Sequence, residues 1–194
     1  MIPDLQQLKE YVQQIQPLSE IEWDAFAEIW KPFNANRKVK ITTMGQQERF
    51  LYFVSAGAQR VYYRDDEDRE ATLVFTYPFS FGGVLDAMLL EKPSKYFYET
   101  LTESRFLRAP YIKLKALQHT HCGIQSLIDK ALHNSIAGLL AREVELQCFS
   151  SEDKFRSLLK RSPHIIHLIP HKYLANYLGI DPTNFSKFMN QIIV

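Results

Sequence analysis

Apolar residues recur at intervals of three and four in the first part of the chain. This spacing predicts helix over residues 4–30, because such positions share one face of an α-helix. We therefore expect an N-terminal helical segment whose apolar face packs on the rest of the protein. That face is formed by Leu5, Leu8, Val12 and Ile15.

Between about residues 34 and 110 the pattern changes to short runs rich in β-branched and aromatic residues, separated by turn-forming residues. The acidic sequence DDEDRE at 65–70 is expected to form the solvated tip of a hairpin. Many short strands at regular spacing predict a sandwich or a barrel. The runs are KVKIT, RFLYFVSAG, AQRVYYRD, EATLVFTY, YFYETLTES and SRFLRAP.

Residues 123–148 carry the longest helical pattern and contain no proline. At 1.5 Å per residue this helix would be roughly 39 Å long, which exceeds what a small β domain can cover. We expect its stripe to meet a second copy in a homodimer, the alternative being a helix packed only on its own domain. The expected contact residues are Ile124, Leu127, Ile128, Ala131, Ser135 and Leu139.

Two short helical patterns flank Gly179 near the end of the chain. Ala175 is small where a second helix must come close, and Gly179 can take the left-handed conformation that ends a helix. Asp181 suits the cap of the next helix, and Pro182 suits its first position. The pattern predicts a helix-turn-helix, a plain helical hairpin being the alternative.

The second of these helices leaves a polar face that is suited to a DNA major groove. Of 23 Lys and Arg and 22 Asp and Glu, residues 150–194 hold six and three, so this segment carries +3 and the remainder −2. A basic segment favours an anionic partner such as double-stranded DNA. Helix 152–161 adds basic candidates for phosphate contact at 154, 156, 160 and 161. The candidate DNA-contacting residues are Lys172, Pro182, Thr183, Asn184, Ser186, Lys187 and Asn190.

The order of β-rich region, long helix and small helix-turn-helix unit resembles the Crp/Fnr superfamily of bacterial transcription regulators. The resemblance implies a jelly-roll sensor of the cyclic-nucleotide-binding type, a homodimer along the long helix and a C-terminal winged helix. It implies a sensor over residues 1–120, a dimerisation helix over 121–149 and a DNA-binding domain over 150–194. The stretches that carry it are YFVSAGAQRVYY, FSFGGVLDAMLLEKPSKYFYETL and IPHKYLANYLGIDPTNFSKF.

The stretch FSFGGVLDAMLLEKPSKYFYETL, residues 79–101, which we call the ligand cassette, departs from the pattern of that family. Cyclic-nucleotide binders have a glutamate after the cassette glycine and an arginine ten residues later, whereas Val84 and Ser94 stand at these positions. Valine accepts no hydrogen bond and serine offers no charged fork to a phosphate. We expect no binding of cyclic AMP in the usual way, and an unidentified small-molecule effector stays open. The candidate ligand-contacting residues are Gly82, Gly83, Val84, Leu85, Ser94 and Lys95.

Other chemistry finds little support in the sequence. His119, His121 and Cys122 are spaced too tightly for a usual zinc pattern. The segment before residue 111 contains no histidine, which disfavours haem in the sensor and a cupin-type metal enzyme. No cofactor is expected, and no pairing of nucleophile and base indicates an enzyme. The two cysteines and the absence of an apolar N-terminal run favour a reduced cytoplasmic setting without a membrane span.

The sequence therefore predicts a cytoplasmic, homodimeric, DNA-binding transcription regulator, for which RNA polymerase is a further candidate partner. The recognition helix contains no arginine, and Lys187 follows Ser186 where family members often have Ser-Arg. Lysine lacks the bidentate fork that pairs with guanine. The alternative is a ligand-binding or interaction protein of the same fold that has lost specific DNA binding.

Overall fold

Two antiparallel sheets form the centre of the molecule, which is described here from a computed structural model over residues 3–192. Their strand orders are β1-β8-β3-β6 and β2-β7-β4-β5, so β5 lies at an edge of the second sheet. Side chains from both sheets share one buried cluster that contains Tyr52, Tyr98 and Phe106, as expected for a β-sandwich. The strands are β1 (Lys31–Ala35), β2 (Lys40–Thr42), β3 (Phe50–Ala56), β4 (Gln59–Arg64), β5 (Glu70–Thr76), β6 (Ser80–Gly82), β7 (Phe97–Thr100) and β8 (Ser104–Pro110).

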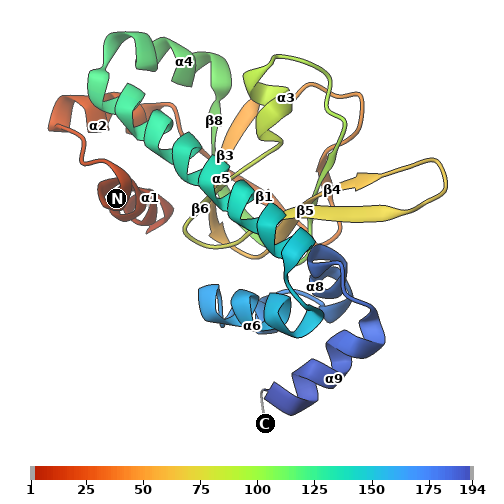
Figure 1. The fold of residues 1–194 in the computed structure, drawn as a ribbon. Helices are drawn as coiled ribbons and strands as arrows, with labels where there is room; N and C mark the ends of the chain where they lie inside the picture. Colours follow the sequence, from red (N-terminus) through yellow and green to blue (C-terminus); the bar gives the residue numbers. More distant parts are fainter. Residues whose placement is uncertain (1–2, 193–194) are drawn as a thin grey trace.

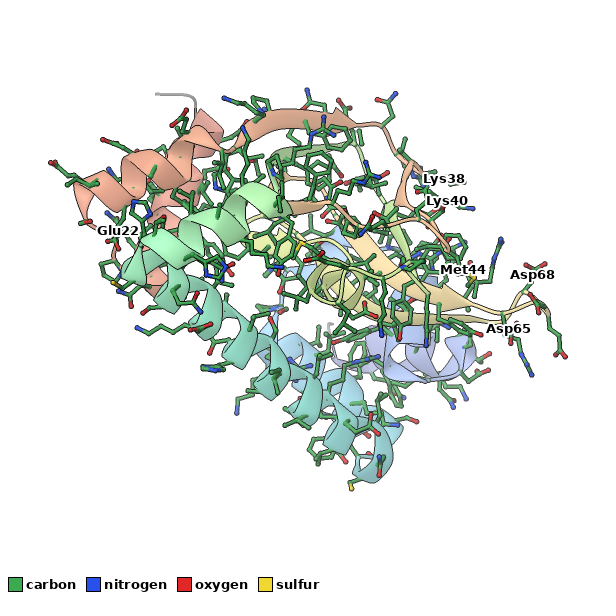
Figure 2. All side chains as sticks on the ribbon, turned by 90° about the horizontal axis from the view of Figure 1, so that it is seen from above. Glu22, Lys38, Lys40, Met44, Asp65 and Asp68 are labelled. Atoms are coloured by element: carbon green, nitrogen blue, oxygen red, sulfur yellow. The ribbon has the colours of Figure 1, made fainter. Side chains whose placement is uncertain are left out.

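The acidic segment forms the tip of a hairpin, as predicted. Strands β4 and β5 pair in antiparallel register from Gln59 and Thr76 to Arg64 and Glu70. Asp65 and Asp68 lie at the outer end of this hairpin, beyond the body of the sheet (Figure 2). Asp65 accepts hydrogen bonds from the backbone N–H groups at 67 and 69, which closes the turn.

The segment predicted as helical over residues 4–30 is helical for most of its length, but it is divided into two helices, α1 (Pro3–Ile15) and α2 (Glu20–Glu28). Pro17 lacks the N–H that would continue the first helix. Ser19 then starts the second with a capping box, in which its hydroxyl accepts from the Glu22 N–H and the Glu22 carboxylate accepts from the Ser19 N–H at 3.1 Å. The same carboxylate accepts from the Gly123 N–H at 2.7 Å, which fixes α2 against the start of the long helix.

The helices after the sheets follow the predicted order, and Figure 1 shows the longest of them, α5, crossing from the N-terminal helices to the C-terminal unit. A short helix within the sheet region carries the cassette. Among the described residues, no helix combines the length and apolar character that a membrane span requires. These helices are α3 (Leu85–Leu89), α4 (Tyr111–Thr120), α5 (Cys122–Cys148), α6 (Ser151–Arg161), α7 (Ile165–Leu168), α8 (His171–Leu178) and α9 (Pro182–Ile192).

Helix α5 has two different environments along its length. Ile124, Leu127 and Ile128 were expected at the dimer contact, but they are buried in the core of their own chain against α1, α2 and β3. These three residues are therefore unavailable to a partner, which corrects the expectation. By contrast, every residue from 133 to 141 is exposed, including Ser135 and Leu139, while Ala131 is half-buried.

The C-terminal unit is built from helices alone. The segment 162–170 contains the single turn α7, and a buried cluster centred on Phe155, Leu174 and Phe185 joins α6, α8 and α9. The wing implied by the family resemblance is not present in residues 149–192, where the structure contains no strand. That part of the expectation is corrected to a helix-turn-helix without a wing in the described chain.

Candidate functional site

The turn between α8 and α9 has the local geometry that the sequence predicts. Gly179 ends α8 in the left-handed conformation at φ +62°, where its missing Cβ avoids strain. Asp181 then accepts hydrogen bonds from the N–H groups of Thr183 at 2.8 Å and Asn184 at 3.4 Å. These bonds lower the pKa of Asp181 and keep its carboxylate charged at the start of α9.

The buried side of the turn holds the two helices together. Ala175 and Phe185 are each 1% exposed, and the Phe185 ring packs edge-on against Phe155 with centroids 5.2 Å apart. Because one side of α9 is used in this core, its other side is directed outward. The helix-turn-helix crossing therefore depends on the residue types that suggested it.

The polar side of α9 is solvent-exposed. Ser186 is exposed, and its hydroxyl donates to the Pro182 carbonyl at 2.9 Å. Neither Lys172 nor Lys187 forms an ion pair with any residue in the described part of the chain. The structure thus brings the candidate DNA-contacting residues to the surface of α8 and α9. They are Lys172, Pro182, Thr183, Asn184, Ser186, Lys187 and Asn190, all exposed.

The basic residues of α6 divide into two kinds. Arg161 pairs with Glu145, which is 8% exposed and also accepts from the Ser157 hydroxyl at 2.7 Å. Arg156 pairs with Glu152 one turn away at 2.7 Å. Arg161 is therefore engaged in fastening α6 to α5, which leaves Lys154 and Lys160 as the α6 candidates for phosphate contact.

The cassette is closely packed by its own chain. A Cβ at Gly82 would collide with the Tyr98 hydroxyl, and Gly83 has a φ of +118° that favours glycine. Val84 is 1% exposed and lies in the cluster with Tyr52 and Tyr98, while Leu85 is half-buried. Aromatic rings therefore surround Val84, whereas Leu85 faces a hollow of the surface.

The second half of the cassette offers no charged fork. Ser94 is 2% exposed, and its hydroxyl donates to the Tyr96 carbonyl at 2.8 Å and accepts from the Tyr96 N–H at 3.0 Å. Its hydrogen-bonding capacity is used within this turn. Lys95 is exposed beside it.

A buried carboxylate that the sequence reasoning missed lies against the cassette. Glu48, from the connection between β2 and β3, is 5% exposed and accepts from the Thr42 hydroxyl at 2.5 Å and from the Val84 N–H at 3.4 Å. Its other oxygen accepts from the N–H groups of Arg49 and Phe50. Burial raises the pKa of Glu48 above its ordinary value. The polar groups at the cassette are therefore satisfied internally.

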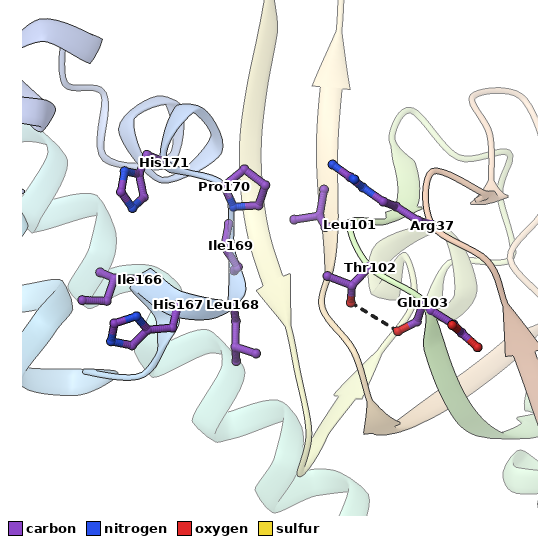
Figure 3. A pocket seen from close by; sticks show the side chains of 10 residues that line it. All are labelled: Arg37, Leu101, Thr102, Glu103, Ile166, His167, Leu168, Ile169, Pro170 and His171. Atoms are coloured by element: carbon purple, nitrogen blue, oxygen red, sulfur yellow. Dashed lines mark hydrogen bonds between the residues drawn. The ribbon is translucent and has the colours of Figure 1, made fainter.

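Two hollows open at the surface. One, of about 520 Å³, opens between the α7–α8 segment and the sheets, with Arg37, His167 and His171 on its walls (Figure 3). The other, of about 440 Å³, lies between α1, α3, α4 and α5, and no charged residue lines it. Of the candidate ligand-contacting residues, Leu85 lines the second hollow, and the other five line neither.

The histidine and cysteine segment does not assemble into a metal site. The Thr120 hydroxyl hydrogen-bonds to the His121 ring, and Cys122 is an exposed free thiol. Among the described residues, no three His, Cys, Asp or Glu side chains are grouped to hold a metal ion. This segment connects α4 to α5.

Comparison with known proteins gives the fold. No family model and no curated protein matches the sequence. FixK2 from Bradyrhizobium japonicum has 12% identity and a TM-score of 0.75, over 85% of each chain. The c-di-GMP-responsive global regulator CLP of Xanthomonas campestris has 15% identity and a TM-score of 0.67, over 90% of this chain and 92% of its own.

A protein from Eubacterium rectale assigned to the Crp/Fnr family of transcriptional regulators has 15% identity and a TM-score of 0.67, over 91% of this chain and 84% of its own. The resemblance to the Crp/Fnr fold and the predicted α+β class are therefore confirmed. At these identities the likeness establishes the fold, and function has to be argued from the site.

Proposed function

We propose that the protein is a homodimeric, DNA-binding transcription regulator. The observation that carries the proposal is the contrast between the two sides of α9: Phe185 is buried, whereas Asn184, Ser186 and Lys187 are exposed. An amphipathic second helix that presents short polar side chains outward is suited to contact base edges in a major groove. The division into a sensor (1–120), a dimerisation helix (121–149) and a DNA-binding domain (150–194) belongs to this proposal.

The dimer contact is proposed for the second half of α5. Ile136, Leu139 and Leu140 are 55%, 53% and 64% exposed, and Val144 is 55% exposed. Four large apolar side chains at helical spacing on an uncovered helix favour a coiled-coil contact with a second copy. Leu140→Glu is expected to shift the protein to a monomer in analytical ultracentrifugation, while Ile112→Glu, at an exposed apolar residue on α4, serves as the control. A monomeric unmodified protein would contradict this part.

DNA binding is tested by selection on random duplex DNA, followed by a fluorescence anisotropy salt series. A regulator is expected to enrich a near-palindromic sequence with half-sites about 34 Å apart. It should also bind that sequence at least about 1,000-fold more tightly than random DNA. A protein that has lost recognition would show only weak binding that salt abolishes. The absence of arginine from α9 favours a protein that has lost specific DNA recognition. Enrichment of one sequence supports the regulator, and binding without enrichment supports this second candidate.

The sensor is proposed not to bind cyclic AMP or cyclic GMP in the manner of the cyclic-nucleotide binders. Support comes from Val84 in the aromatic cluster, the inward-turned Ser94 and the self-satisfied Glu48. Calorimetric titration with cyclic AMP, cyclic GMP and cyclic di-GMP is expected to give no heat of binding. Micromolar binding of cyclic AMP or cyclic GMP would contradict the proposal, whereas binding of cyclic di-GMP alone would identify a different effector.

A further inference from the structure

Helix α8 is fastened to the free edge of β5 by a side-chain amide. The Asn176 carbonyl oxygen accepts from the Thr72 N–H at 2.7 Å, and the Asn176 amide donates to the Glu70 carbonyl at 2.7 Å. These two groups belong to the outer side of an edge strand, where they would otherwise face solvent. The amide thus bonds to β5 as a neighbouring strand would.

Arg142 of α5 joins the same edge from the other side. Its guanidinium donates to the Thr72 carbonyl at 3.3 Å, the Leu73 carbonyl at 3.2 Å and the Tyr177 carbonyl at 2.5 Å. It also lies 3.9 Å from the centre of the Tyr177 ring. One side chain therefore connects the long helix, the sheet and the first helix of the helix-turn-helix. We call the contacts of Asn176 and Arg142 with β5 the β5 joint.

A second contact between α8 and the sheet, centred on the buried Arg60, supports the joint. The Arg60 guanidinium lies between the rings of Tyr62 and Tyr173, at 3.8 and 4.0 Å from their centres. Its charge is met by Glu70 at 2.7 Å and Glu99 at 3.0 Å. Because Tyr173 and Tyr177 both belong to α8, the helix contacts the sheet at two successive turns.

The joint is incompletely satisfied. Thr72 Oγ1 and Arg142 Nε are buried side-chain atoms without a hydrogen-bond partner. A buried polar atom left unpaired opposes the stability of the contact that buries it. These two unpaired atoms therefore make the joint less stable than the same contact with every polar atom hydrogen-bonded.

We infer that Asn176 and Arg142 are positioning residues that fix α9 relative to the sensor and so set the half-site spacing that the dimer accepts. This inference rests on the proposed function. In a dimer joined through α5, the separation of the two recognition helices depends on where each helix-turn-helix lies on its own sensor. An intact joint favours one spacing, and an open joint tolerates several.

The joint itself is tested without DNA. Amide hydrogen exchange of the full chain, followed by NMR, is expected to show at least about tenfold faster exchange at Thr72 in Asn176→Ala, because the N–H loses its acceptor. Asn176→Asp keeps the acceptor for the Thr72 N–H but replaces the donor to the Glu70 carbonyl with a second acceptor, so it is expected to show an intermediate loss of protection. Asn176 is exposed, so neither change removes core packing. Asn34→Ala, at an exposed position on β1, is the control.

The spacing role is tested on duplexes in which the selected half-sites are moved apart or together by two base pairs. The unmodified protein is expected to lose about tenfold in affinity on either change, and Asn176→Ala and Arg142→Ala to lose less than about threefold. Arg142→Lys keeps the charge without the bidentate fork, so its loss of affinity on changed spacing is expected to lie between that of the unmodified protein and that of Arg142→Ala. Affinity for a single half-site should stay constant, because α9 is unaltered.

The outcomes separate the two proposals. Unchanged Thr72 exchange in Asn176→Ala overturns the joint, whatever the protein does with DNA. Altered exchange with an unchanged spacing profile overturns the positioning role while leaving DNA binding intact. If the unmodified protein binds no specific duplex, the proposed function fails and the spacing role fails with it.

Discussion

The cassette, inside the two-sheet sandwich, and the outer side of α9 differ in whether their polar groups are hydrogen-bonded within the chain. At the cassette, Glu48 and Ser94 bond to their own chain, and Val84 is covered by aromatic rings. On α9, Asn184 and Lys187 are exposed, and Lys187 forms no ion pair with the described chain. Both regions were candidates for binding, but only the second leaves donors and acceptors available to a partner.

The difference shows that two regions of one fold can differ in what they leave available to a partner. The packed side chains at the cassette contribute to stability, so changes there should be measured in unfolding. A surface that stays bare contributes little to stability, so changes there should be measured in binding. Substitutions in the two regions should therefore separate cleanly into these two readouts.

Val84→Glu, which introduces the residue expected at this position in a cyclic-nucleotide binder, should have the largest effect. The new carboxylate would be buried beside the Glu48 carboxylate, since the Val84 N–H already donates to Glu48. We expect a loss of about 3 kcal/mol or more in unfolding free energy, because a buried unpaired charge is very unfavourable. Urea denaturation measures it. Val39→Glu, at a residue 38% exposed, should change stability by less than about 0.5 kcal/mol.

Gain of cyclic AMP binding by Val84→Glu without loss of stability would contradict the contrast between the cassette and α9. It would mean that one substitution is enough to make the cassette bind a ligand.

Gly82→Ala is expected to have the next largest effect. The added methyl group would meet the Tyr98 hydroxyl, which hydrogen-bonds to Thr76 at 2.9 Å and has little freedom to move. Overpacking of this kind costs about 1–3 kcal/mol. The double variant with Tyr98→Phe removes the hydroxyl and should recover part of the loss. A stability equal to that of the unmodified protein would indicate empty space at the cassette.

Lys187→Ala should act on the opposite readout. Removing one exposed cation from α9 is expected to weaken DNA binding about tenfold and to lower the slope of log affinity against log salt by about 1. The unfolding free energy should stay within about 0.5 kcal/mol. Lys113→Ala, on exposed α4, is the matched control and should change neither quantity. A destabilised Lys187→Ala protein would mean that this face is packed in solution.

Glu48→Gln is expected to have the smallest effect, visible only as a change in pH dependence. Burial raises the folded-state pKa of Glu48, so the folded protein holds this proton to higher pH than the unfolded chain does. Its contribution to stability is therefore present below the ordinary glutamate pKa and is lost as pH rises through the folded-state pKa. The glutamine variant should lose this downward slope, which for one proton is at most about 1.4 kcal/mol per pH unit.

Urea denaturation between pH 4 and pH 8 measures the two profiles. Parallel profiles would show that the pKa of Glu48 is the same in the folded and unfolded states, which would contradict this prediction.

Local chemistry made the helix-turn-helix predictable. Gly179, Asp181 and Pro182 each act within one turn of helix, so their residue types fix the geometry without help from distant segments. The break between α1 and α2 was readable in the same way, since Pro17 and the Ser19–Glu22 capping box lie together in the sequence.

Long-range packing was not predictable in this way. The stripe on α5 gave no sign that Ile124 and Leu127 would be covered by α1 and α2, because those helices lie about a hundred residues earlier in the chain. Glu48 is 36 residues from Val84, and only the fold brings the two together. Asn176 and Glu70 are 106 residues apart, and a single exposed asparagine carries no local signal.

Because α8 and α5 bond to the outer side of β5, the Thr72 N–H and the carbonyls of Glu70 and Thr72 are already engaged there. A fragment that stops before the C-terminal helices would leave the Thr72 N–H and the Glu70 carbonyl exposed to pair with a strand of another molecule. Such a fragment should therefore form oligomers or precipitate on purification, and attempts to study the two sheets alone would need a substitute for the missing helix.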